Sequence, residues 1–214
     1  MALLKLWRWA AVVGALAPAV AGAAVSCVLD DPDKDIRAVF PSYTSYKTEF
    51  FTMDEFGGKT VKAEVERKLG DKLDNEYETT DIAHAVYTIY QGKTLLGYVA
   101  GETQKGVFGA MQIVLATDPA GVIKDWYYQR LTHPEADKLR AASFRKQFDG
   151  LSLTEYYYMR EHYPSLAPGP DKAALTNPLT ADQGDFLNTL RGQMKDLILL
   201  DIFKLNRVHD AKEK

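Results

Sequence analysis

Apolar residues alternate with small or polar residues along positions 83 to 131, over four short runs separated by breaks that contain glycine. Because side chains of a β-strand point alternately to its two faces, Ile113 and Leu115 are expected on one face of the third run and Val114 on the other. Both faces are largely apolar, so we expect both to be covered. Residues that favour turns occupy two of the breaks, at Gly92 and at Asp118-Pro119-Ala120-Gly121. The pattern predicts an antiparallel meander sheet over about residues 83–131.

Helical patterns precede this sheet. Asp31 followed by Pro32 has the form of an N-cap with proline at the first helical position, and Pro41 is expected to end that short helix. A second helix is predicted over residues 59–69, where valine or leucine recurs every four residues and Gly70 follows as a C-terminal stop. The remainder of this N-terminal part is expected to be helix and loop laid on the sheet.

Helical patterns also follow the sheet. Thr132-His133-Pro134-Glu135 has the spacing of a capping box and is expected to open a helical stretch that ends at Gly150. Residues 153–159 fit a strand or a helix. Residues 163–178 hold four of the nine prolines, which indicates a long ordered loop or a flap. An amphipathic pattern predicts a last helix over about residues 182–205. The fold class is therefore predicted to be α+β, with N-terminal, middle and C-terminal helices covering the sheet.

The chain of 214 residues is long enough for one domain, which we place at residues 27–214. Residues 1–26 have a positively charged start, an uncharged run and small residues at alternate positions, which is typical of a secretory signal peptide. Two alternatives stay open: a lipid on Cys27, or an uncleaved membrane anchor. Each of the three predicts a periplasmic or other extracytoplasmic protein.

Charge and cysteine content exclude several function classes. The formal net charge is −3, and no cluster of positive charge favours nucleic acid as a partner. Cys27 is the sole cysteine, so the folded part has no internal disulfide, no cysteine-based metal site and no thiol nucleophile. We find no catalytic motif and no histidine spacing typical of a zinc site. His133 lies in a loop just after the sheet and is a candidate binding residue; alternatively, it is solvated beside a helix that Thr132 caps.

Three segments together resemble the periplasmic FMN-binding domain family: "LLGYVAGETQKGVFGAMQ", "IVLATDPAGVI" and "FRKQFDG". The resemblance covers roughly residues 33–200. The family includes the flavin-carrying subunits of sodium-pumping NADH:quinone reductase and of related electron-transport complexes. It implies a flavin carrier or redox-complex subunit in electron transfer, with a redox partner protein or membrane electron-transport complex, and not a turnover enzyme in itself.

In that family a flavin transferase joins the FMN phosphate to the threonine of a short motif before the last helix. The matching position here is Asn177-Pro178-Leu179-Thr180-Ala181, which retains only Thr180, with Asn177 a loose match to the first residue. Proline and leucine stand where the family has small residues. Thr180 also begins a capping box, Thr180 to Gln183, as the alternative to a covalent or non-covalent flavin site.

If a flavin binds, we expect further contacts from charged and aromatic side chains. Arg140 and Arg145 are candidates to face the flavin phosphate or ring nitrogen N1, and Tyr157 is a candidate to stack on the ring, with Tyr127 and Tyr158 as alternatives. Departure from the attachment motif keeps a second function open. This is a flavin-free periplasmic binding or assembly module that uses the same fold.

Overall fold

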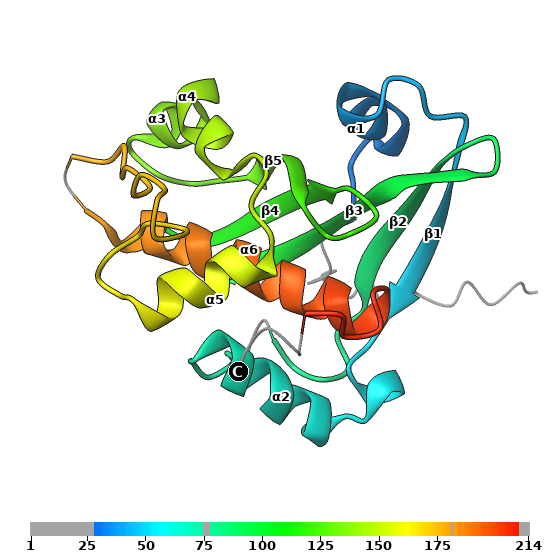
Figure 1. Cartoon of the computed structure of the whole chain (residues 1–214), viewed down its shortest axis with the longest axis horizontal. Coiled ribbons are helices and arrows are strands. Elements are labelled where there is room, and N and C mark those ends of the chain that lie inside the picture. The colour runs from blue at the N-terminus through cyan, green and yellow to red at the C-terminus, as the bar shows by residue number, and fades with distance from the viewer. Residues whose placement is uncertain (1–27, 75–77, 181, 210–214) are drawn as a thin grey trace, which may run out of the picture.

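The computed structural model describes residues 28–74, 78–180 and 182–209 of the chain. Its centre is a five-stranded antiparallel sheet in which every strand lies beside its neighbours in sequence (Figure 1). The strands are β1 (Ser45–Phe51), β2 (His84–Gln91), β3 (Thr94–Lys105), β4 (Ala110–Thr117) and β5 (Ile123–Arg130). The predicted α+β class and the meander over residues 83–131 are confirmed. Our expectation that the N-terminal part holds only helices and loops is wrong, because β1 adds a fifth strand against β2.

Glycines permit two of the close turns of the sheet. Gly92 and Gly121 have φ angles of 59° and 81°, the left-handed region that glycine adopts without steric cost, and they lie in the predicted turns. Gly97 lies where the pairing of β2 with β3 shifts register, with φ at 151°. A Cβ atom there would lie 1.9 Å from the carbonyl oxygen of Thr117, so the approach of β3 to β4 requires glycine.

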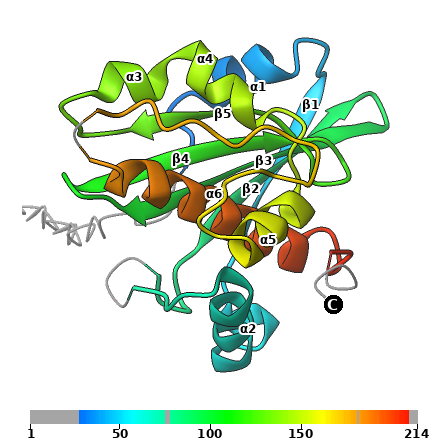
Figure 2. The same ribbon diagram turned by 60° about the vertical axis from the view of Figure 1, so that its left-hand side comes forward.

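The two faces of the sheet are covered as the alternation predicted. Ile113 and Leu115 contribute to the larger core, together with residues of the C-terminal helix, whereas Val114 and Ala116 belong to a second core on the opposite face. Helix α1 (Pro32–Val39) supplies Ile36 to this second core. Figure 2 shows the sheet between α1 and the C-terminal helix.

The remaining helices lie on or beside the face that α6 covers. They are α2 (Lys59–Leu69), α3 (Ala136–Arg140), α4 (Ala142–Arg145), α5 (Leu153–Glu161) and α6 (Gly184–Phe203), with short 3₁₀ helices η1 (Asp54–Phe56) and η2 (Lys146–Phe148). Trp126 of β5 makes edge contacts with Phe144 and Phe148, which fixes α4 and η2 against the sheet. Helix α6 is two residues shorter at each end than the predicted helix over residues 182–205.

Several helix ends follow the sequence signals. Asp31 caps α1, accepting a hydrogen bond from the Lys34 amide at 3.2 Å, and Gly70 ends α2 in the left-handed conformation. Residues 153–159 belong to α5, because Ser152 and Glu155 form a capping box that decides for helix over strand. The capping box predicted at Thr132–Glu135 is wrong: Glu135 is itself the N-cap residue of α3 and makes no side-chain cap.

Residues 163–178 form the predicted loop between α5 and α6. Its two ends are tied by a backbone hydrogen bond from Leu175 to Leu166 at 2.9 Å. In the described part of the chain, no helix is long and apolar enough to cross a membrane. Residues 1–26, the predicted signal peptide or anchor, lie outside the described residues.

Candidate functional site

The exposed side chain of Thr180 lies in a cluster of polar groups that come from two distant segments. Its hydroxyl donates a hydrogen bond to Glu135 Oε1 at 2.7 Å, and its backbone amide donates to Glu135 Oε2 at 3.0 Å. Lys138 Nζ lies 3.4 Å from the Thr180 hydroxyl and also forms an ion pair with Glu135. The fold therefore joins the segment that follows β5 to the segment that precedes α6. The second of these segments contains Thr180, the residue that the resemblance links to flavin attachment.

Charge is balanced in this cluster. The hydrogen bond from Lys138, followed by those from Thr180, lowers the pKa of Glu135 to about 2, so the carboxylate is ionised at neutral pH. Lys138 supplies one positive charge beside the hydroxyl, and Glu135 supplies one negative charge. The arrangement can hold an anionic group on Thr180 through Lys138, but only with Glu135 opposing it.

His133 stands at the edge of the cluster with one free donor. Its Nδ1 accepts a hydrogen bond from the Glu135 amide at 2.9 Å, which leaves the proton of the neutral ring on Nε2. Nε2 is buried and has no hydrogen-bond partner among the described residues. Phe108, which is 45% exposed, meets the His133 ring edge-on with the centroids 4.9 Å apart.

The turn between β3 and β4 carries two exposed apolar side chains to the start of α6. Val107, 51% exposed, donates its backbone amide to Asp185 Oδ1 at 2.6 Å. A Cβ atom on Gly184 would lie 2.5 Å from a methyl group of Val107, so this glycine allows the turn to approach the helix. An exposed apolar surface, formed by Val107 and Phe108, thus lies between His133 and the first turn of α6.

The capping box predicted at Thr180–Gln183 is wrong. Gln183 is the N-cap residue of α6 and makes no side-chain cap, while Thr180 is bound to Glu135. Asp182 accepts the amide of Gly184 at 2.7 Å. Because acidic side chains already occupy the start of α6, this helix end offers little attraction to a further anion.

Two residues just before Thr180 adopt conformations that leave its side chain accessible. Asn177 accepts the Leu179 amide through its side-chain oxygen at 2.9 Å, forming a local turn. Leu179 is buried and belongs to the larger core, so its side chain does not crowd the exposed Thr180 hydroxyl. Leu179 therefore serves packing.

The other predicted flavin contacts have separate partners. Arg140 donates to the backbone carbonyl of Tyr128 at 2.6 Å. Arg145 pairs with Asp125 at 2.5 Å in a different cleft of about 400 Å³, beside α1. Tyr157 is buried in the core, with the Arg160 guanidinium 5.2 Å from its ring centre. The structure therefore brings together Thr180 and His133 and leaves Arg145 and Tyr157 elsewhere.

A second polar cluster is buried between α6 and the sheet. Lys195, only 2% exposed, binds Glu78 at 2.5 Å, the carbonyl oxygen of Thr103 at 2.8 Å and Glu102 at 3.3 Å. His84 Nδ1 lies 2.5 Å from the other oxygen of Glu102. A buried ammonium and two buried carboxylates thus satisfy one another at the centre of the molecule.

The pKa values in this buried cluster move in opposite directions. Burial acts to raise the pKa of Glu102, but the neighbouring His84 and Lys195 outweigh it and lower the pKa. Asp196 follows Lys195 in sequence and is also buried; burial, together with the charge of Glu102, raises its pKa well above the usual value. The cluster therefore holds Glu102 ionised and favours the protonated form of Asp196.

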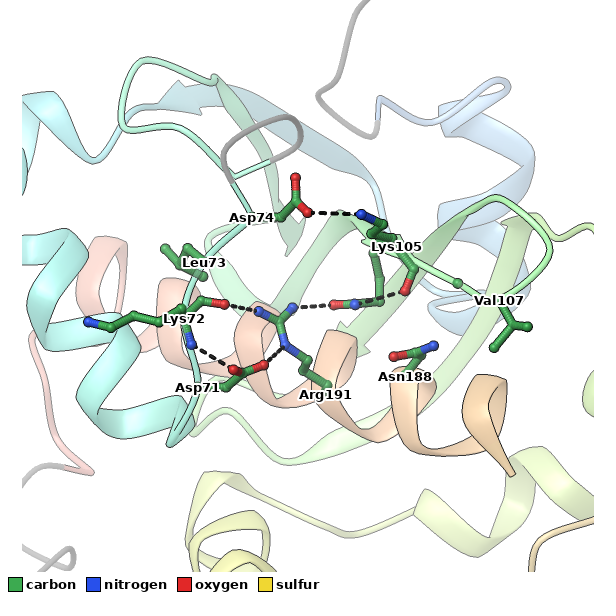
Figure 3. A pocket seen from close by; sticks show the side chains of 10 residues that line it. Asp71, Lys72, Leu73, Asp74, Lys105, Val107, Asn188 and Arg191 are labelled. Atoms are coloured by element: carbon green, nitrogen blue, oxygen red, sulfur yellow. Dashed lines mark hydrogen bonds and ion pairs between the residues drawn. The ribbon is translucent and has the colours of Figure 1, made fainter. Parts of the chain in front are cut away.

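Arg191 extends the buried cluster to the surface. It binds both oxygens of Glu78, at 2.8 and 3.1 Å, and the side-chain oxygen of Gln104 at 2.7 Å. It lines an open cleft of about 590 Å³ and lies near Asp71 and the Lys72 carbonyl (Figure 3). Burial opposes ionisation of Glu78, but Arg191 and Lys195 lower its pKa to about 2. Arg191 thus fastens the segment after α2 to α6.

Sequence reasoning missed the partners in both clusters. Glu135 was assigned to a helix cap, and Lys138, Phe108 and Val107 were not singled out. For the cluster around Thr180, the available signal was the apolar pair Val107-Phe108 between two glycines, a pattern that indicates an exposed turn. For the buried cluster, the signals were charged residues that interrupt apolar runs, at Glu102 and at Lys195, since such groups are buried only when paired.

No protein-family model matches the chain, and the search of curated proteins finds no significant match.

Proposed function

We propose that the protein is an exported electron-transfer protein that carries FMN at Thr180, as a flavin carrier or a subunit of a redox complex. The observation that carries the proposal is the position of Lys138 Nζ, 3.4 Å from an exposed threonine hydroxyl. A phosphoester on that hydroxyl would place its negative charge beside the ammonium group. The proposal also rests on the resemblance of residues 33–200 to the FMN-binding domain family.

The groups around Thr180 suit the rest of such a ligand. Val107 and Phe108 offer an exposed apolar surface for an aromatic ring system, and Phe108 lies edge-on against the His133 ring. When bound, FMN supplies the capacity to accept and release electrons, and the residues named here bind and orient it. The leader-like segment at residues 1–26 supports the periplasmic location that the proposal includes, and the covalent form would require a flavin transferase.

The test is expression with export in a host that has the flavin transferase, followed by absorbance and intact-mass measurement. We expect a yellow protein whose mass exceeds that of the mature chain by one FMN, and we expect Thr180→Ala to abolish the added mass. Thr176→Ala is the matched control, because Thr176 is an exposed threonine of the same loop. Colour that is lost on denaturation supports non-covalent binding. A colourless protein that also takes up no added FMN contradicts the proposal.

One observation favours a second candidate, a flavin-free binding or assembly module. The Glu135 carboxylate already accepts both the hydroxyl and the amide of Thr180, and its charge repels a phosphate. In that case Thr180 ties the loop before α6 to α3, and the apolar surface of Val107 and Phe108 contacts a partner. A colourless protein in the experiment above supports this candidate.

A further inference from the structure

The first strand, β1, forms one edge of the sheet. It pairs with β2 over its whole length, from Ser45 to Phe51, and it is the last strand in the order β1-β2-β3-β4-β5. Figure 1 shows it as the outermost strand on its side of the molecule. Such an edge carries backbone N–H and C=O groups that another strand can bind.

Side chains of β1 alternate between the two faces. Glu49 forms an ion pair with Lys204 at 2.6 Å, and Phe51 stacks on Phe203 of α6 with the ring centroids 5.4 Å apart. Odd-numbered positions therefore face α6. On the other face, Tyr46 lies against the second core, whereas Phe50 is 54% exposed because its neighbour on β2 is only Ala85.

The sequence of β1, Ser-Tyr-Lys-Thr-Glu-Phe-Phe, is complementary to itself in antiparallel pairing. If two copies pair about Thr48, Lys47 of each lies opposite Glu49 of the other, and Tyr46 lies opposite Phe50. These are opposite-charge and aromatic cross-strand pairs, both of which stabilise a sheet. Lys47 is 66% exposed, so its ammonium group is free to reach a second carboxylate besides that of Glu49 in its own chain.

The charges also select this register. A two-fold axis at position 47 places Lys47 opposite itself, and an axis at position 49 places Glu49 opposite itself. Each arrangement opposes like charges, which is unfavourable. A lysine on an edge strand ordinarily prevents edge-to-edge association, but here the facing residue is a glutamate in the one register centred on Thr48.

We propose that β1 is a homodimer interface, through which two copies of the chain join their sheets edge to edge about a two-fold axis at Thr48. The axis runs perpendicular to the sheet, so both copies keep α6 on the same side. Two Lys47–Glu49 pairs lie on that side, and two Tyr46–Phe50 pairs lie on the other.

Sedimentation equilibrium of the purified protein over a wide concentration range tests the proposal. We expect a monomer–dimer equilibrium, which Lys47→Glu weakens about tenfold or more because both charge pairs become repulsive. Mixing Lys47→Glu with Glu49→Lys is expected to restore association as a heterodimer. Lys93→Glu is the control for net charge, since Lys93 is exposed in the turn between β2 and β3.

Hydrogen exchange locates the interface independently. Amides of β1 are expected to gain protection as the protein concentration rises, while those of β5 at the opposite edge do not change. Lys47→Glu also removes the ion pair with Glu49 of its own chain, but Lys47 is exposed and Glu49 keeps its ion pair with Lys204, so we expect the monomer to stay folded. Circular dichroism of the variant checks this, and its sedimentation then reports on association. A protein that stays monomeric at all concentrations overturns the proposal, as does a dimer that Lys47→Glu leaves intact.

Discussion

Lys195 and Lys138 each neutralise a glutamate, but Lys195 is buried between α6 and the sheet whereas Lys138 lies at the surface beside Thr180. Lys195 is held by three protein oxygens within 3.3 Å. Lys138 shares one carboxylate with a threonine hydroxyl, in contact with water. A buried charge needs every one of its partners, whereas an exposed charge can exchange them. We therefore expect the first cluster to contribute more to stability, and the second is the one at which we propose that a ligand binds.

The largest expected effect is the loss of the buried ammonium. Lys195→Met removes the cation that neutralises Glu78 and Glu102, and breaking a buried pair in this way costs about 3–5 kcal/mol. The matched surface change, Lys138→Met, is expected to alter the free energy of unfolding by less than about 1 kcal/mol. Urea unfolding followed by circular dichroism measures both. Equal effects of the two substitutions would remove the distinction between the clusters.

The decrease in stability at acid pH is expected to depend on protonation of the buried Glu78 carboxylate. The pKa of Glu78 is about 2 in the folded protein against 4.5 when it is unperturbed, so its stabilising contribution is complete above about pH 4.5 and is lost as the pH falls toward 2. This shift corresponds to about 3 kcal/mol. Glu78→Gln should therefore be less stable than wild type at pH 7, with the difference vanishing near pH 2.

Glu135 provides the comparison for that experiment. Its pKa is lowered to about 2 as well, but its partner Lys138 is exposed and solvent screens the interaction. The stability of Glu135→Gln is expected to track that of wild type across the same pH range, in urea unfolding at each pH. If Glu135→Gln reproduces the profile of Glu78→Gln, exposure does not separate the two carboxylates.

The sequence predicts the sheet better than it predicts either cluster, for a physical reason. Strand alternation over residues 83–131 is a local pattern, so periodicity alone locates four strands. β1 was missed because four of its seven positions are exposed and the other three are only half-buried, which interrupts the alternation. Its place at the edge, with one neighbour, explains that exposure.

Both polar clusters depend on contacts between distant segments. The Thr180 hydroxyl binds Glu135, 45 residues away, and Lys195 binds Glu78, 117 residues away. In the exposed cluster, Thr180 and Glu135 both stand where a capping box is expected, whereas no local pattern marks Glu78 or Lys195. In the structure these two side chains bind each other and do not cap a helix. No local sequence pattern predicts a hydrogen bond between such distant residues.

A smaller effect of opposite sign is expected at Asp196. Burial and the charge of Glu102 raise its pKa, so the folded state binds a proton that the unfolded state releases above about pH 4, and stability falls as the pH rises through that range. Asp196→Asn removes this cost and should make the protein more stable than wild type at pH 7. Urea unfolding at pH 4 and pH 7 is the measurement. Destabilisation at pH 7 would show that Asp196 is needed as a charge.

The smallest effects are expected at the surface cluster, on binding of free FMN to protein made without the transferase. Lys138→Met should weaken binding about fivefold and Glu135→Gln should strengthen it by a similar factor, because one charge about 4 Å from a phosphate in water contributes about 1 kcal/mol. Neither substitution should change the affinity for riboflavin, which lacks the phosphate. Fluorescence titration with both ligands separates the outcomes: equal changes for FMN and riboflavin would place the phosphate away from Lys138 and Glu135, and hence away from Thr180.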